Sequence, residues 1–251
     1  MMHLLPKRWF RMALGLGVWL LAWPLLASDA EEILRGMDGK LHSGSWESFS
    51  QVAFELPNGR VNKVTLYVAR QSGRKAVAVV VAPDELKGRA VLRVGDEVWM
   101  HVPGELEVRR SGLMNSLVGG VFNNADLLVG DWLEEYQPTL LKENDEIRQL
   151  ELKPRFSGSP YARMVLEVDR KNGMPLRLEQ YDAGGGMIKT IHYRNVQPMD
   201  GDHLHPLVME SASGLNAKYR STWQLGQMNS REFPAEAFTR EFLPHAGRLM
   251  K

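Results

Sequence analysis

Hydrophobic and polar positions alternate along most of the chain beyond residue 45. Val64, Leu66 and Val68 alternate with residues that are more polar or of mixed character. A similar alternation surrounds Leu166 and Trp223. Turn residues such as the Pro-Asn-Gly-Arg segment 57–60 separate the alternating runs. A period of two between such turns is typical of antiparallel strands with one buried face. The pattern predicts a mainly β protein with about eleven strands.

Two longer segments depart from this alternation. Residues 30–37 place Ile33, Leu34 and Met37 on one side of a short helix. Residues 111–132 are apolar, interrupted by glycines, and lack the period of two. We predict two short helical turns joined by a loop there, with Asn124 as the N-cap of the turn 125–129.

The predicted helices are too few to cover a sheet of this size. A large sheet with little helical cover curls into a barrel or a half-barrel. Its concave face is then filled by its own side chains, by the segment 111–132, or by a ligand. The alternation alone fits a fully packed core and a ligand cavity equally well.

The N-terminus has the organisation of an export signal. Residues 1–11 carry three basic residues and no acidic residue, residues 12–26 are apolar, and small residues follow at Ala27, Ser28 and Ala30. This order is typical of a secretory signal peptide, and the apolar run is shorter than the ~20 residues that usually span a bilayer. We predict a signal peptide over residues 1–30, cleaved after Ala27 or Ala30, and a single domain over residues 31–251.

Composition narrows the functional classes. The 251 residues include 31 Lys and Arg against 30 Asp and Glu, so there is no basic excess for binding nucleic acid. The absence of cysteine excludes disulfides, thiolate zinc sites and thiol catalysis. It also removes the acceptor for an N-terminal lipid anchor. We therefore expect a soluble periplasmic protein that is not lipid-anchored.

Catalytic and metal-binding motifs are missing from the sequence. It contains no Gly-x-Ser-x-Gly, no phosphate-binding loop and no His-Glu-x-x-His. His203 and His205 share one face of a predicted strand, but no further metal ligand follows at a recognisable spacing. We predict no enzyme activity, no metal and no cofactor. Arg109 and Arg110 could contact a lipid phosphate or an acidic partner, although a plain surface pair is the commoner arrangement.

Several segments, taken in order, resemble one family. They are residues 92–103 (Leu-Arg-Val-Gly-Asp-Glu-Val-Trp-Met-His-Val-Pro), 108–110, 119–128, 161–163 and 175–182. In order and spacing the chain resembles the outer-membrane lipoprotein-sorting proteins, relatives of the periplasmic carrier LolA and its receptor LolB. One motif departs from the family. Where the family reads Met-Gly-Ser-Asp-Phe, residues 118–122 read Val-Gly-Gly-Val-Phe, so any role of the Ser-Asp pair is in doubt here.

The resemblance implies an unclosed, strongly curved antiparallel sheet, an incomplete barrel whose hydrophobic concavity is lidded by short helices. It also implies a carrier that transfers a lipid or lipoprotein acyl chain toward the outer membrane. Transient contact with membranes or membrane proteins follows, and an inner-membrane exporter of the resistance-nodulation-division type is the implied partner. The alternative from a different class is an accessory subunit of an export complex, with a packed core and no ligand.

Candidate lipid-contacting residues follow from the apolar face of each predicted strand. The predicted cleft lining is Val64, Leu66, Val68, Val77, Val79, Leu166, Leu176, Leu178 and Trp223. The predicted underside of a lid formed by residues 111–132 is Leu113, Leu117, Val118 and Phe122.

Overall fold

The computed structural model describes residues 29–41, 44–56, 58–199, 201 and 203–251. The first group of strands is β1 (Trp46–Glu55), β2 (Val61–Gln71), β3 (Lys75–Ala82), β4 (Ala90–Val94), β5 (Glu97–His101) and β6 (Arg109–Arg110). The second group is β7 (Tyr136–Glu143), β8 (Ile147–Pro154), β9 (Arg163–Asp169), β10 (Pro175–Tyr181), β11 (Met187–Met199), β12 (His203–Ser213) and β13 (Arg220–Ser230). The helices are α1 (Asp29–Leu41), α2 (Asn124–Leu127), α3 (Trp132–Glu135) and the 3₁₀ helices η1 (Ala235–Phe238) and η2 (Leu243–Met250).

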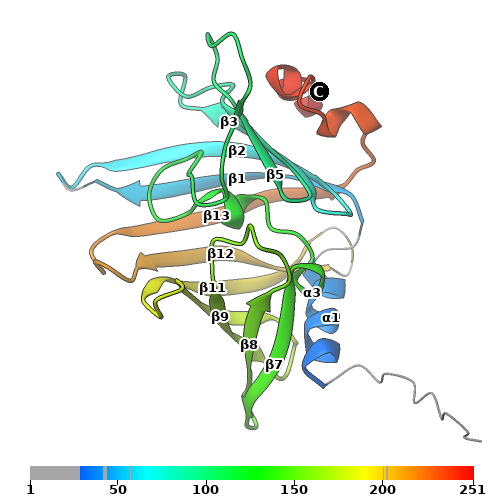
Figure 1. Ribbon diagram of the computed structural model, residues 1–251, viewed down its shortest axis with the longest axis vertical. Coiled ribbons are helices and arrows are strands. Elements are labelled where there is room, and N and C mark those ends of the chain that lie inside the picture. The colour runs from blue at the N-terminus through cyan, green and yellow to red at the C-terminus, as the bar shows by residue number, and fades with distance from the viewer. Residues whose placement is uncertain (1–28, 42–43, 57, 200, 202) are drawn as a thin grey trace, which may run out of the picture.

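All thirteen strands of the described residues form one antiparallel sheet in the order β6-β5-β4-β3-β2-β1-β13-β12-β11-β10-β9-β8-β7 (Figure 1). The terminal strands β6 and β7 do not pair with each other, so the sheet stays open. The predicted mainly β, incomplete barrel is confirmed, with two strands more than the predicted count of about eleven.

Chain topology explains why one segment covers the sheet. The strands β1 to β6 lead outward to one edge, and the chain resumes pairing only at β7, on the opposite edge. The connecting segment 111–135 must therefore cross the sheet, and its apolar side chains join the cluster on the concave face. Figure 1 shows it in green in front of the central strands, with α1 beside α3 and β7. We call residues 111–135 the crossing segment.

Bulges in five strand pairings help to curve the sheet. The register skips one residue in each pairing: Gly226 in β13, Val81 in β3, Leu141 in β7, Leu176 in β10 and Ile188 in β11. A bulge adds one unpaired residue, bends its strand and increases the local twist. These bulges interrupt the alternation on which the assignment of strand faces depends.

Two hydrophobic clusters lie on opposite faces of the sheet. The concave cluster contains Leu66 and Val68, together with α1 and the crossing segment. The convex cluster contains Tyr67 and residues of η1 and η2, which cover β3 and β4 near the C-terminus (Figure 1). Because η1 and η2 cover the convex side, β3 and β4 are buried on both faces.

The predicted inward orientation of Val77 and Val79 is wrong. In the register of β2 with β3, Leu66 faces Val80 whereas Tyr67 faces Val79, and directly paired residues share a face. Val77 and Val79 accordingly belong to the convex cluster, and the concave positions of β3 are the neighbouring Ala76, Ala78 and Val80. The sequence of β3 is apolar at both alternating sets, so its pattern does not distinguish the faces.

Leu176 also departs from its predicted place in the lining. It is the extra residue of the bulge between Pro175 and Arg177, it is half-buried, and it belongs to neither hydrophobic cluster. The adjacent Pro175 and Leu178 occupy the concave face instead. The extra residue interrupts the alternation of β10. Leu176 therefore does not share the face of Leu178, although the two residues are two positions apart.

Most of the predicted signal peptide lies outside the described residues. Its last two positions, Asp29 and Ala30, begin α1, and Ala30 is buried against the concave cluster. The helix is longer than the predicted segment 30–37, since it continues to Leu41. Among the described residues, no helix has both the length and the apolar character needed to cross a bilayer.

Replacing Gly120 by Ala is expected to destabilise the protein by about 2–4 kcal/mol. Gly120 has a φ of 70°, and an added Cβ would lie 2.5 Å from Ser221 Oγ and 2.7 Å from Phe54 Cβ. Gly36→Ala in α1 is the matched control, because its Cβ meets nothing within 4 Å. The control should stabilise the helix by about 0.5–1 kcal/mol. Urea unfolding of both variants checks the pair, and an equal effect of the two substitutions would contradict this packing.

Candidate functional site

A cavity of about 130 Å³ lies between the concave face and the crossing segment. Its wall is mainly apolar and aromatic: Leu41, Trp46, Val68, Phe122, Ala125, Leu127, Val129, Trp132, Met164, Pro175, Leu178, Ile191, Pro206, Met209, Trp223, Leu225 and Met228. The polar lining residues are fewer: Ser48, Asp126, Tyr136, Tyr161, Gln180, Tyr193 and His205. An apolar cavity with a few polar groups is the usual form of a site for a small molecule or an acyl chain.

The remaining predicted residues divide between the cavity wall and the packed layer around it. Val68, Leu178, Trp223 and Phe122 line the cavity. The rest of the correctly oriented set is buried in the concave cluster but does not line the cavity: Val64, Leu66, Leu166, Leu113, Leu117 and Val118. Phe122 packs edge-on against Trp223, with ring centroids 5.6 Å apart. The crossing segment therefore closes directly on the residues of the sheet.

The cavity is small for a whole acyl chain. Pockets for drug-sized ligands usually measure ~300–1,000 Å³, and an apolar cavity of about 150 Å³ holds only a ligand the size of benzene. A space of about 130 Å³ therefore accommodates a small part of an acyl chain. A whole acyl chain needs a larger space than this one.

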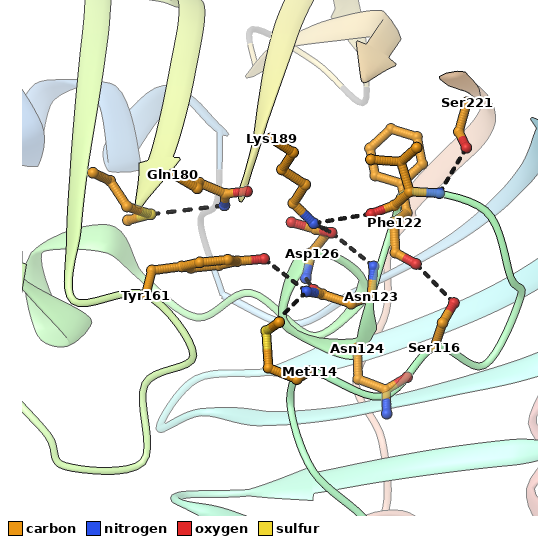
Figure 2. A network of polar contacts seen from close by, with 12 residues as sticks. Met114, Ser116, Phe122, Asn123, Asn124, Asp126, Tyr161, Gln180, Lys189 and Ser221 are labelled. Atoms are coloured by element: carbon orange, nitrogen blue, oxygen red, sulfur yellow. Dashed lines mark hydrogen bonds and ion pairs between the residues drawn. The ribbon is translucent and has the colours of Figure 1, made fainter. Parts of the chain in front are cut away.

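A buried ion pair joins the crossing segment to β11. Lys189 Nζ contacts Asp126 Oδ2, and both side chains are almost fully buried. The same ammonium group donates to the carbonyl oxygen of Val121 at 3.2 Å. Figure 2 shows Lys189 reaching from its strand to the turn that carries Asn123 and Asp126. Both partners of the Lys189 ammonium group belong to the crossing segment. The charge is therefore paired while this segment lies against β11.

Asn123 connects the same turn to Tyr161. Its Nδ2 donates to Tyr161 Oη at 2.8 Å, and its backbone N–H donates to Asp126 Oδ2 at 2.8 Å. Asn123 is thus the N-cap of α2, in a capping box with Asp126. The predicted N-cap, Asn124, is wrong by one residue. Asn124 is fully buried and instead binds the backbone of Gly112 and Leu117.

Close backbone contact attaches the glycines of the segment to the sheet. The backbone N–H of Val121 donates to Ser221 Oγ on β13 at 2.9 Å (Figure 2). Gly119 and Gly120 both have positive φ and pack against Phe54. The Gly-Gly-Val sequence at 119–121 therefore allows the backbone of the segment to approach the side chains of Phe54 and Ser221 closely, a contact that side chains at 119 and 120 would obstruct.

A second set of polar contacts fixes the other end of the crossing segment. Arg93 Nη1 lies 2.8 Å from Glu135 Oε1 and 3.0 Å from the carbonyl oxygen of Leu128, and the Arg93–Glu135 pair is buried. Arg70 pairs with Asp131 at 2.7 Å. Two ion pairs from β2 and β4 thus anchor residues 128–135, and they leave residues 111–127 as the part that closes over the cavity.

Asp38 of α1 caps the first turn of α3. Its two carboxylate oxygens accept from the backbone N–H groups of Trp132 and Leu133, at 3.0 and 2.9 Å. Burial raises the pKa of Asp38 to about 6, and the two backbone hydrogen bonds partly oppose this effect. The N-terminal helix therefore helps to position Trp132 at the cavity wall.

Arg109 and Arg110 lie apart from the cavity. Both side chains are exposed on the edge strand β6, where Arg109 pairs with Glu105 at 2.7 Å and Arg110 with Glu97 at 2.5 Å. Arg110 also stacks on the ring of Trp99, which packs against the convex cluster. Neither arginine lines the cavity. The structure therefore does not support a contact between these arginines and the head group of a ligand bound in the cavity.

His203 and His205 do not form part of a metal cluster, and no group of metal ligands occurs in the described residues. His205 is buried at the cavity wall, and its burial lowers the pKa to about 4, with a smaller contribution from His203. Burial on β12 therefore keeps this imidazole neutral in the folded protein at neutral pH.

The neutral state of His205 predicts a loss of stability in acid. The unfolded chain takes up a proton near pH 6.5 and the folded chain only near pH 4, so stability falls as pH decreases between these values. We expect a cost of about 2 kcal/mol between pH 7 and pH 5. His205→Gln should remove it, whereas His245→Gln at an exposed site should not. Urea unfolding at both pH values checks this, and equal pH dependence of wild type and His205→Gln would contradict it.

Comparisons with known proteins identify the fold. A family model described as "Uncharacterized protein" matches residues 72–245, while no protein with a curated description matches the chain in sequence. A LolA superfamily protein from Nitrosomonas europaea superposes with a TM-score of 0.78 at 22% identity, over 86% of this chain and 100% of that one.

Two further structures are similar. A putative outer membrane lipoprotein-sorting protein domain from Vibrio parahaemolyticus gives a TM-score of 0.74 at 18% identity, over 86% and 98% of the two chains. A DUF1329 family protein from Desulfovibrio piger gives 0.74 at 19% identity, over 85% and 97%. The predicted resemblance is confirmed at the level of the fold.

Proposed function

We propose that this chain, which belongs to the family whose model matches residues 72–245 and has the LolA superfamily fold, is a periplasmic carrier of acylated cargo. It binds the acyl chain of a lipid or lipoprotein in the cavity of the concave face and transfers it toward the outer membrane. The crossing segment opens to admit the chain and closes over it.

One observation carries this proposal: an apolar cavity lies beneath a segment that reaches the sheet through a small set of polar contacts. An acyl chain contributes ~0.8 kcal/mol per buried CH₂ group, so a dry apolar wall supplies affinity without any catalytic group. The sheet provides such a wall through Val68, Leu178 and Trp223. The ion pair of Lys189 with Asp126 provides a contact that forms only in the closed state.

The description of one similar protein supports the proposed class of cargo. One structural match is described as an outer membrane lipoprotein-sorting protein domain. A sorting protein shields an acyl chain from water between two membranes, and the closed cavity under the crossing segment suits that task. We propose a lipoprotein or lipid as cargo, and an inner-membrane exporter of the resistance-nodulation-division type as partner.

Export through a cleaved signal peptide is part of the proposal. Cleavage after Ala27 would retain Ala30, which is 3% exposed within α1. Cleavage after Ala30 would remove it and expose the first turn of the helix. N-terminal sequencing of the exported protein checks this. A mature start at Ser28 or at Glu31 supports the proposed signal, and retention of Met1 contradicts it.

Tryptophan fluorescence offers a direct test of binding. Trp46, Trp132 and Trp223 line the cavity, whereas Trp99 packs on the convex side. A brominated fatty acid such as 9,10-dibromostearate quenches tryptophans only at short range. We expect saturable quenching in the wild type, and weaker quenching once the three cavity tryptophans are replaced by Phe. Absence of quenching, with no lipid in a solvent extract of the purified protein, would favour the packed accessory subunit.

A further inference from the structure

Two polar side chains in the wall of the cavity suggest what kind of acyl chain it accepts. We infer that the cavity selects chains that carry a hydroxyl group along the hydrocarbon in addition to the acyl carbonyl. Gln180 binds the hydroxyl group and Trp223 binds the carbonyl oxygen. This inference rests on the proposed carrier function and specifies its ligand.

Gln180 is a buried amide with few protein contacts. It is 3% exposed, lines the cavity from β10, and its Oε1 accepts no hydrogen bond from any described residue. Its Nε2 lies 3.7 Å from Met164 Sδ, which is a weak acceptor (Figure 2). Buried amide oxygens are nearly always paired, so Gln180 presents an acceptor to whatever enters the cavity.

Trp223 presents the complementary group from another strand. It is 7% exposed, lines the cavity from β13, and its Nε1–H donates to no described residue. Buried indole N–H groups usually find a partner. Phe122 of the crossing segment packs edge-on against the same ring, and both residues line the cavity. The lining of the cavity thus includes one acceptor and one donor that pair with no described residue.

The separation of these groups favours a hydroxyacyl chain over an amide. Gln180 and Trp223 belong to strands between which β11 and β12 intervene, and adjacent strands lie about 4.8 Å apart. The N–H and C=O of one amide are too close together to reach both side chains. A hydroxyl group several carbons from the carbonyl can donate to Gln180 Oε1 while the carbonyl accepts from Trp223 Nε1. An unsubstituted acyl chain would pair with Trp223 Nε1 but would bury Gln180 Oε1 without a partner.

The test compares stearate, 12-hydroxystearate and the amide N-stearoylglycine by calorimetric titration of the full mature protein. We expect 12-hydroxystearate to bind about tenfold more tightly than stearate, because only its hydroxyl group gives the buried Oε1 of Gln180 a hydrogen bond. Equal affinities for the two acids would overturn the inference while leaving the carrier function intact. Tighter binding of N-stearoylglycine than of 12-hydroxystearate would also overturn it. Failure of all three to bind would instead contradict the proposed function.

Variants separate the roles of the two residues. Gln180→Leu should abolish the tenfold preference and leave stearate affinity within about twofold, whereas Trp223→Phe should weaken the binding of both acids about threefold and keep the preference. Gln224→Leu, at the exposed neighbouring position on the opposite face, is the matched control and should keep the full preference. Gln180→Leu should also melt at the same or a higher temperature, because it removes an unpaired buried amide. A preference that survives Gln180→Leu would overturn the assignment.

Discussion

Replacement of Asp126 by Asn should destabilise the protein by about 3–5 kcal/mol, because it leaves the Lys189 ammonium group buried without its carboxylate. Lys189 is 1% exposed, and its remaining acceptor among the described residues is the carbonyl oxygen of Val121. Asp96→Asn is the matched control, since Asp96 pairs with Arg74 on the exposed surface and should contribute less than about 1 kcal/mol. Urea unfolding measures both variants.

The double variant Asp126→Asn with Lys189→Met separates the ion pair from the rest of the fold. Removal of both charges should restore most of the lost stability, because no unpaired charge stays buried. The same variant should take up an acyl probe faster than the wild type, since the closed segment loses its contact with β11. Additive losses in the double variant, or unchanged uptake, would contradict the assignment of this pair as the closing contact.

Leu66→Arg should unfold the domain, with a loss of more than about 4 kcal/mol. Leu66 is 0% exposed and lies in the concave cluster beneath the cavity wall, without lining the cavity itself. A guanidinium group there reaches neither water nor an acid. Leu106→Arg, at a fully exposed loop position, is the control and should leave the fold intact.

Circular dichroism and urea unfolding read out the result for Leu66→Arg. A folded variant with near-native stability would mean that this part of the concave face opens to water. It would also move the boundary of the cavity from Val68 to Leu66. An unfolded variant supports a packed layer around a small, closed cavity.

The alternation of the sequence predicts the fold class because each strand has one face in the concave cluster. It places Val64, Leu66, Val68, Leu166 and Leu178 on the correct face, since these strands alternate clearly. It fails at Val77 and Val79 because η1 and η2 cover the convex side of β3, and both faces of that strand are apolar. Sequence periodicity does not reveal a partner that arrives from a distant part of the chain.

The polar contacts of the site were less accessible to sequence analysis. Lys189, Asp126, Arg93 and Glu135 are separated by many residues, and each is an ordinary charged residue in isolation. A lysine at a concave position of a strand was the available signal, but bulges made the face of β10 and β11 uncertain. The capping residue was displaced by one position because Asn123 and Asn124 are adjacent and equally suited to cap a helix.

The central claim is that an acyl chain enters the cavity only when the crossing segment leaves the sheet. The chain has no cysteine, so a disulfide between Val121→Cys and Ser221→Cys can join the two, at a point where Val121 N and Ser221 Oγ lie 2.9 Å apart. Stearate titration of the oxidised and the reduced double variant is the decisive measurement. We predict binding only in the reduced form, and equal binding by a fully crosslinked protein would contradict the account.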